Sequence, residues 1–166
     1  MRKEAGFSLQ RKTMVVNTKI FGEIDIDDSK IVTFENGIIG FPELKHFAVV
    51  YDEEKKGPNR ISYLQSIEEG QFALPVMNPT TVKEDYNPFV DDELLKPLGE
   101  LTGENICVLV TVKVPSNIEQ ISVNLKAPVI INVDEKKGAQ VIIEDDYPVR
   151  FPIYEILKQN KEKGGE

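Results

Sequence analysis

Residues 118–143 constrain the fold of this chain more than any other part of its sequence. The apolar residues in this segment first alternate with polar ones and then form two clusters: Ile121, Val123 and Leu125, then Val129, Ile130, Ile131 and Val133, then Val141, Ile142 and Ile143. This pattern predicts successive β-strands rather than the apolar stripe of an amphipathic helix. The segment therefore predicts three neighbouring strands.

Two turn sequences separate these strands. In the first, Pro128 lacks an amide donor and keeps Ala127 out of the helical region, which predicts a bend or bulge. In the second, residues 134–138 are polar and end at Gly138, which is free to take a positive φ. We expect the second and third strands to form a hairpin.

Other strands are predicted from shorter apolar runs. Residues 17–26 alternate as one half-buried strand, and residues 30–34 return as its partner. Further strands are expected at residues 47–51, 61–66, 72–77 and 105–114. The last of these is apolar enough to be nearly central, whereas Pro75 places residues 72–77 at a sheet edge or end. Asp91 predicts the N-cap of a short helix that ends near Leu95.

These elements predict an all-β, mainly antiparallel chain with a small barrel-like fold and one or two short helices. Barrel closure leaves fewer strand edges exposed than an open sheet does. We expect residues 1–13 to be a disordered extension, an expression remnant or an upstream start, and residues 14–150 to form a single domain. Residues 151–166 are expected to hold one helical turn at 154–158 and a flexible tail from 161 onward.

The charge of the chain is unevenly distributed. Residues 1–13 carry four Lys or Arg and one Glu, so residues 14–166 hold 16 basic and 27 acidic groups, a net charge of −11. Such a field repels phosphate backbones and speeds encounter with basic protein surfaces, so we expect no direct binding to nucleic acid. The alternative is that the acidity only keeps the protein soluble.

Cysteine usage and hydropathy indicate a cytoplasmic protein. The single cysteine, Cys107, permits no internal disulfide, and residues 1–13 lack the apolar stretch of a signal peptide. The longest apolar run, residues 106–114, is about half as long as a membrane-spanning helix must be. We therefore expect no membrane contact, and we expect the free protein to be monomeric.

No catalytic constellation is predicted. The only histidine, His46, begins a short strand and is expected at the surface, and Cys107 lies in the most apolar strand as an inert thiol. The acidic run at residues 25–29 begins like a calcium loop, but Lys30 and Asn36 replace the glycine and glutamate that such a loop needs. We expect no enzyme activity, no cofactor and no metal. Two alternatives stay open: a hydrolase with two carboxylates in a deep pocket, and a carrier with an empty apolar interior.

Apolar residues in loops are the best candidates for contact with a partner. Three groups occur: Ile38, Ile39, Phe41 and Pro42; Leu125, Ala127 and Pro128; and Phe89 with Val90. The alternative is that these loops fold back and plug the mouth of the barrel.

Five motifs occur in order between residues 14 and 150, at residues 34–44, 63–66, 112–115, 124–132 and 138–142. Together they resemble the flagellar assembly factor family FliW. The resemblance implies a cytoplasmic, non-enzymatic β-barrel protein that binds flagellin before its export and also binds the translational repressor CsrA. When flagellin is exported, the freed factor sequesters CsrA, and flagellin is translated again.

The predicted partner-facing rim consists of apolar or amide residues on bends. These residues are Phe41, Pro42, Asn124, Leu125, Ala127 and Pro128. The competing interpretation is that the same motifs only fix the barrel, with Asn124 and Asn132 satisfying backbone groups at a bulge.

Overall fold

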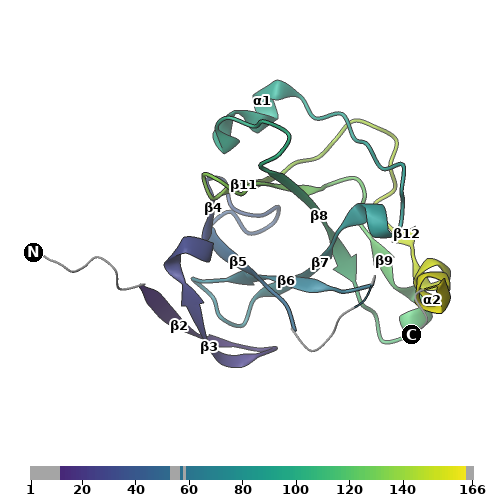
Figure 1. Cartoon of the computed structure of the whole chain (residues 1–166), viewed down its shortest axis with the longest axis horizontal. Coiled ribbons are helices and arrows are strands. Elements are labelled where there is room, and N and C mark those ends of the chain that lie inside the picture. The colour runs from purple at the N-terminus through teal and green to yellow at the C-terminus, as the bar shows by residue number, and fades with distance from the viewer. Residues whose placement is uncertain (1–11, 53–56, 58, 164–166) are drawn as a thin grey trace, which may run out of the picture.

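Seven strands close into a barrel in the computed structural model, which describes residues 12–52, 57 and 59–163 (Figure 1). They are β4 (Val32–Phe34), β5 (His46–Val50), β6 (Ser62–Ser66), β7 (Ala73–Met77), β8 (Ile106–Lys113), β10 (Val129–Asn132) and β11 (Lys137–Gln140). The ring closes because β10 pairs with β11 on one side and with β8 on the other. All these pairs are antiparallel except β11 with β4, so the predicted all-β, mainly antiparallel barrel is confirmed.

Smaller elements surround the barrel. They are the hairpin of β2 (Thr13–Thr18) and β3 (Gly22–Asp27), the short strands β9 (Ser122–Val123) and β12 (Phe151–Pro152), the helices α1 (Asp92–Leu95) and α2 (Tyr154–Lys163), and the 3₁₀ turns η2 (Asp28–Lys30), η3 (Pro79–Thr81), η4 (Lys96–Leu98) and η5 (Ile118–Gln120). Within the described part of the chain, no helix is long and apolar enough to cross a membrane.

Aromatic and branched side chains fill the interior of the barrel. The rings of Phe34 and Phe47 meet edge to face with their centroids 5.3 Å apart, and Leu64, Val129 and other apolar residues pack around them. Gly138 is needed for this packing, because a Cβ there would lie 2.5 Å from Cζ of Phe34. The sequence predicted that Gly138 serves the turn, but Gly138 instead permits close packing inside β11. The positive φ of that turn, 57°, belongs to Lys136.

The third strand of residues 118–143 lies earlier than predicted. The expected hairpin is present as β10 and β11, but β11 ends at Gln140, before the apolar run from Val141 to Ile143. That run still bonds as an extended segment, since the Val141 amide donates to the Pro128 carbonyl and the Ile143 amide to the Lys126 carbonyl. These bonds hold it against the residue 124–128 bend.

The single strand predicted over residues 17–26 is wrong, because a turn divides this region into β2 and β3. The Thr18 hydroxyl donates to the Gly22 carbonyl and accepts from the Phe21 amide, and Gly22 takes a φ of +68°. Nor does β4 return as the partner of β3. It pairs with β5 and β11 as part of the barrel.

The predicted centrality of residues 105–114 is confirmed, since β8 pairs with β7, β9 and β10. The prediction that Pro75 marks an edge or end is half right. β7 lies between β6 and β8, but it pairs with β8 only through Val76 and Met77. These two residues lie between Pro75 and Pro79, which cannot donate to a ladder.

The chain ends differ from the prediction. Asp91 caps α1 as expected, with its carboxylate accepting from the Glu93 amide. The C-terminal helix is longer than one turn, and it continues through Lys163, so residues 161–163 are not part of a tail. Asn59 and Asn160 help to fix this helix, since their side chains donate to the Leu157 and Thr81 carbonyls. Thr13 already belongs to β2, while residues 1–11 and 164–166 lie outside the described residues.

Candidate partner-binding site

The two segments predicted to meet a partner lie on opposite walls of one groove, which we call the bend groove. Its volume is about 390 Å³, and it is lined by Ile38, Ile39, Phe41, Leu74, Thr111, Asn124, Lys126, Ala127, Gln140, Ile142 and Val149. Phe41, from the first segment, and Asn124 and Ala127, from the second, therefore share one surface feature although more than 80 residues separate them in the sequence.

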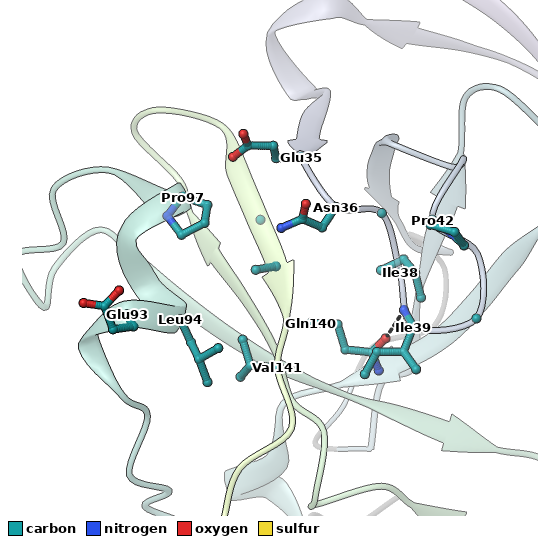
Figure 2. Close-up of a pocket in the computed structure, with 14 residues that line it drawn as sticks. Glu35, Asn36, Ile38, Ile39, Pro42, Glu93, Leu94, Pro97, Gln140 and Val141 are labelled. Atoms are coloured by element: carbon teal, nitrogen blue, oxygen red, sulfur yellow. Dashed lines mark hydrogen bonds between the residues drawn. The ribbon is translucent and has the colours of Figure 1, made fainter.

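Gln140 joins these two segments. Its side-chain oxygen accepts from the Ile39 amide at 3.0 Å, and its side-chain nitrogen donates to the Ala127 carbonyl at 3.2 Å (Figure 2 shows the first bond). An amide side chain is suited to this position because it donates and accepts at once. The last residue of β11 therefore sets the width of the bend groove.

A second depression of about 400 Å³, the loop pocket, lies on the other side of Ile39 and Gln140 (Figure 2). The loop of residues 35–42 forms one wall, β11 forms the floor, and α1 with Pro97 forms the opposite wall. Pro42 lines this pocket rather than the bend groove. The residue 35–42 loop therefore has accessible surface on both sides.

The residue 35–42 loop is held in an outward conformation. Gly37 has a φ of +68°, and a Cβ there would lie 2.6 Å from the Phe41 carbonyl oxygen. Ile38 points inward and is 3% exposed, whereas Ile39 and Phe41 are 48% and 40% exposed. Phe41 also packs against Phe72, with ring centroids 4.5 Å apart, which limits its rotation. The loop thus presents apolar side chains from a fixed backbone.

The residue 124–128 bend is built in the opposite way. The Asn124 side-chain oxygen accepts from the amides of Lys126 and Ala127, which forms the tight turn. Leu125 is fully buried, and its carbonyl accepts from the Tyr86 hydroxyl at 2.7 Å. Burial, together with the nearby Tyr147 and Asp145, raises the pKa of Tyr86, so this hydroxyl stays protonated as a donor.

The six predicted rim residues therefore differ in exposure. Phe41 and Pro42 are exposed and Asn124 is half-buried, but the side chains of Leu125, Ala127 and Pro128 are buried. The expected exposure of those last three does not hold, because the bend turns its apolar side chains into the core. Whether the six residues contact a partner stays a prediction.

Sequence reasoning missed six of the residues that line the bend groove: Leu74, Thr111, Lys126, Gln140, Ile142 and Val149. Ile142 and Val149 are 60% and 58% exposed, which makes them the most exposed apolar residues of the groove wall. Successive side chains of an extended segment point to opposite faces, so the consecutive residues Val141, Ile142 and Ile143 could not all enter the core, and the structure exposes Ile142 between its two buried neighbours. No local signal marks Val149.

The histidine and the thiol lie apart from the groove lining. His46 is at the surface, and its Nδ1 lies 2.5 Å from Oε2 of Glu68. The two oxygens of this carboxylate also accept from backbone amides, Oε2 from Lys45 and Oε1 from His46. Burial acts to raise the pKa of Glu68, but the bonds from His46 and Lys45 outweigh it and hold this pKa below its usual 4.5. Cys107 is half-buried, and burial raises the pKa of its thiol.

The acidic run at residues 25–29 forms a local cap. The Asp27 carboxylate accepts from the amide and the hydroxyl of Ser29 at the start of η2. In the described part of the chain, no group of three or more His, Cys, Asp or Glu side chains could hold a metal ion.

The fold and the groove define a class: small, mainly antiparallel β-barrel proteins with an open apolar groove on the surface. The family model described as FliW protein matches residues 14–153. This chain belongs to the FliW family.

Flagellar assembly factors FliW of two bacteria are among the most similar relatives. The protein of Lachnoclostridium phytofermentans is 45% identical over 151 residues, which cover 90% of this chain and 97% of that protein. The protein of Lachnospira eligens is 48% identical over 150 residues, which cover 89% and 99%. A crystal structure of the flagellar assembly factor FliW has a TM-score of 0.77 at 28% identity, and the match covers 85% of this chain and 97% of that one.

Proposed function

We propose that this chain is a cytoplasmic regulator that binds flagellin before its export and antagonises the repressor CsrA by exchanging one partner for the other. It acts by binding one of these two partners at a time and not by catalysis. Membership of the FliW family supports a role in flagellar assembly. The acidic body of the chain, with a net charge of −11 over residues 14–166, favours encounter with a basic RNA-binding protein.

The observation that carries this proposal is the exposed apolar wall of the bend groove. Ile39, Phe41, Ile142 and Val149 are each at least 40% exposed and line the same depression. Contiguous apolar surface on a soluble protein is typical of an interaction site. The hydrogen bonds of Gln140 preorganise the groove, so little ordering entropy is lost when a partner binds.

The two alternative functions receive less support. A carrier needs an empty interior, but side chains such as Phe34, Phe47 and Leu64 fill this barrel. A hydrolase needs two converging acids in a deep pocket, whereas Glu35 and Glu93 lie on separate walls of the loop pocket (Figure 2). Neither arrangement matches its expected site.

The proposal is tested by placing a charge in the groove without disturbing the core. Ile142→Asp changes an exposed residue outside the regular strands, and Phe41→Asp changes the facing wall. Val15→Asp is the matched control, because Val15 is 61% exposed on the β2–β3 hairpin and does not line the groove.

Binding of each variant to flagellin and to CsrA is measured by calorimetry, and thermal unfolding is measured in parallel. We expect the two groove variants to bind at least one partner about tenfold more weakly or worse, at an unchanged melting temperature. Val15→Asp should bind as the native protein does. Unchanged affinity of both groove variants for both partners would refute the groove as the site, and absence of micromolar binding by the native protein would refute the function.

A further inference from the structure

One edge of β8 is paired along its whole length and the other is not. The Thr111 carbonyl accepts from Asn124 and the Asn105 carbonyl accepts from Val133, so the odd-numbered residues direct their backbone groups toward β9 and β10. In an antiparallel ladder, successive residues direct these groups to opposite edges. The amides and carbonyls of Ile106 and Val108 therefore face the edge that β7 occupies further along.

β7 does not reach these two residues. Its register with β8 stops at Met77 opposite Val110, so the next bonding position opposite Val108 would be Pro79. Pro79 has no amide to donate, and its carbonyl already accepts from Val82 and Lys83 in the η3 turn. Among the described residues, none forms a backbone bond with Ile106 or Val108 on this edge.

A depression of about 630 Å³ lies along this free edge. β8 and Ile130 form one side, and the segment that leaves η3 toward α1 forms the other, which Figure 1 shows passing alongside β8. The facing side chains include Pro79, Pro88, Val90 and Leu95. No residue of this depression lines the bend groove or the loop pocket, so it is a separate feature.

We propose that the free edge of β8 at Ile106–Val108 is a docking site for an extended peptide segment of a protein partner, which adds to the sheet as a strand. Two amides and two carbonyls spaced along a strand match the backbone of another strand and few other ligands. A partner needs only about three residues, or 10 Å of extended chain, to pair with both positions. This site goes beyond the proposed function and does not depend on it.

The surroundings indicate the side chains of the segment. The walls are apolar, which favours apolar residues at alternate positions. The segment that forms the facing side carries four carboxylates between residues 84 and 92, and the one lysine of this segment, Lys83, pairs with Asp85, so basic flanking residues are favoured. Phe89 belongs to the same segment but is not among the residues that line the depression, and it is 75% exposed, the largest exposure among the large apolar residues of the described chain.

The first test uses hydrogen exchange of the native protein, followed by NMR. In the free protein, the amides of Ile106 and Val108 should exchange rapidly, while those of Cys107 and Leu109 should be protected. The probe is a short capped peptide in which valine and threonine alternate between two terminal lysines. Saturating peptide should slow exchange at Ile106 and Val108 about tenfold or more. Protected Ile106 and Val108 amides in the free protein would refute the open edge.

Two controls separate strand addition from apolar contact alone. The same peptide with its core amides N-methylated keeps the side chains but loses the donors, and it should bind about tenfold more weakly. Ile106→Pro removes an amide that the β10 ladder does not use, so it should weaken binding with little effect on the melting temperature. Ile106→Ala keeps this amide and should bind more tightly than Ile106→Pro.

Three outcomes would overturn the proposal: no saturable binding of the alternating peptide up to about 1 mM, equal binding of the N-methylated peptide, or equal binding of Ile106→Pro and Ile106→Ala. A concentration-dependent dimer that the peptide dissociates would also overturn it, because the edge would then serve a second copy of this chain. Sedimentation velocity distinguishes that case.

Discussion

The residue 35–42 loop and the residue 124–128 bend share one sequence feature but differ in the exposure of their apolar side chains. Each places apolar residues beside a proline, outside the regular strands. The loop exposes Phe41 at 40%, whereas the bend buries Leu125 completely. The difference lies in the hydrogen bonds, because the bend carbonyl of Leu125 has the Tyr86 hydroxyl as a buried partner. A bend whose polar groups are satisfied inside the protein can enter the core.

This comparison shows that an apolar residue in a loop can be either buried or exposed. The same sequence feature supplies core packing in the bend and accessible surface in the loop. Gln140 binds both segments, so the buried bend serves as the support on which the exposed loop rests. Four predictions test this division of roles.

The largest effect is expected at Leu125. Leu125→Ala should lower the free energy of unfolding by about 2–5 kcal/mol, because it removes a fully buried side chain. Phe41→Ala should lower it by about 1 kcal/mol, since Phe41 is partly exposed and loses mainly its contact with Phe72. Urea unfolding measures both values. Equal losses would remove the distinction between bend and loop.

Tyr86→Phe tests the bond that keeps the bend buried. Loss of the hydroxyl leaves the Leu125 carbonyl without its donor, at a cost of about 1–3 kcal/mol. The pKa of Tyr86 is raised in the folded protein, so the native protein should lose stability above pH 10, where Tyr86 of the unfolded chain ionises. Tyr86→Phe should lose less over the same pH range. Identical alkaline profiles would count against the role of this hydroxyl.

Gln140→Ala tests the link between the two segments. It removes two hydrogen bonds and should cost about 0.5–1.5 kcal/mol for each, reduced by solvent access to the half-buried side chain. Faster hydrogen exchange is expected at the Ile39 amide, with little change at the Ala127 amide, which bonds to Asn124. Gln140→Glu, which keeps the acceptor, serves as the control. An unchanged rate at Ile39 in Gln140→Ala would show that the link is dispensable.

The smallest effect is expected at Glu68, which binds the chain just after the loop through the Lys45 and His46 amides. Glu68→Gln should cost less than about 1 kcal/mol near neutral pH, because this pair is partly exposed. The pKa of Glu68 lies below 4.5 in the folded protein, so its stabilising effect is present above pH 4.5 and is lost as the pH falls through the folded-state pKa. Thermal unfolding between pH 3 and pH 6 should therefore show that the melting temperature of Glu68→Gln falls less on acidification than that of the native protein.

Much of the fold could be predicted because strand signals are local. The alternation at residues 105–114 identified β8, and the polar run after Val133 identified the hairpin of β10 and β11. Errors arose where one side chain redirected the backbone. The turn that Thr18 and Gly22 form splits the first predicted strand. The Phe34 ring leaves no room for a side chain at position 138, which is why a glycine is needed there. The site was predicted in part, since Phe41, Asn124 and Ala127 share the bend groove.

The sequence by itself determined the strand periodicity, the acidic charge and the motifs that place the chain in the FliW family. These properties depend on residue type and spacing along the chain. Only the tertiary structure decided that Leu125 is core and Ile142 is surface, that Gln140 joins two distant segments, and that Pro79 leaves part of β8 unpaired. Each of these properties depends on contacts between residues that are far apart in the sequence. The closure of the barrel determines those contacts, and local sequence patterns contain no information about them.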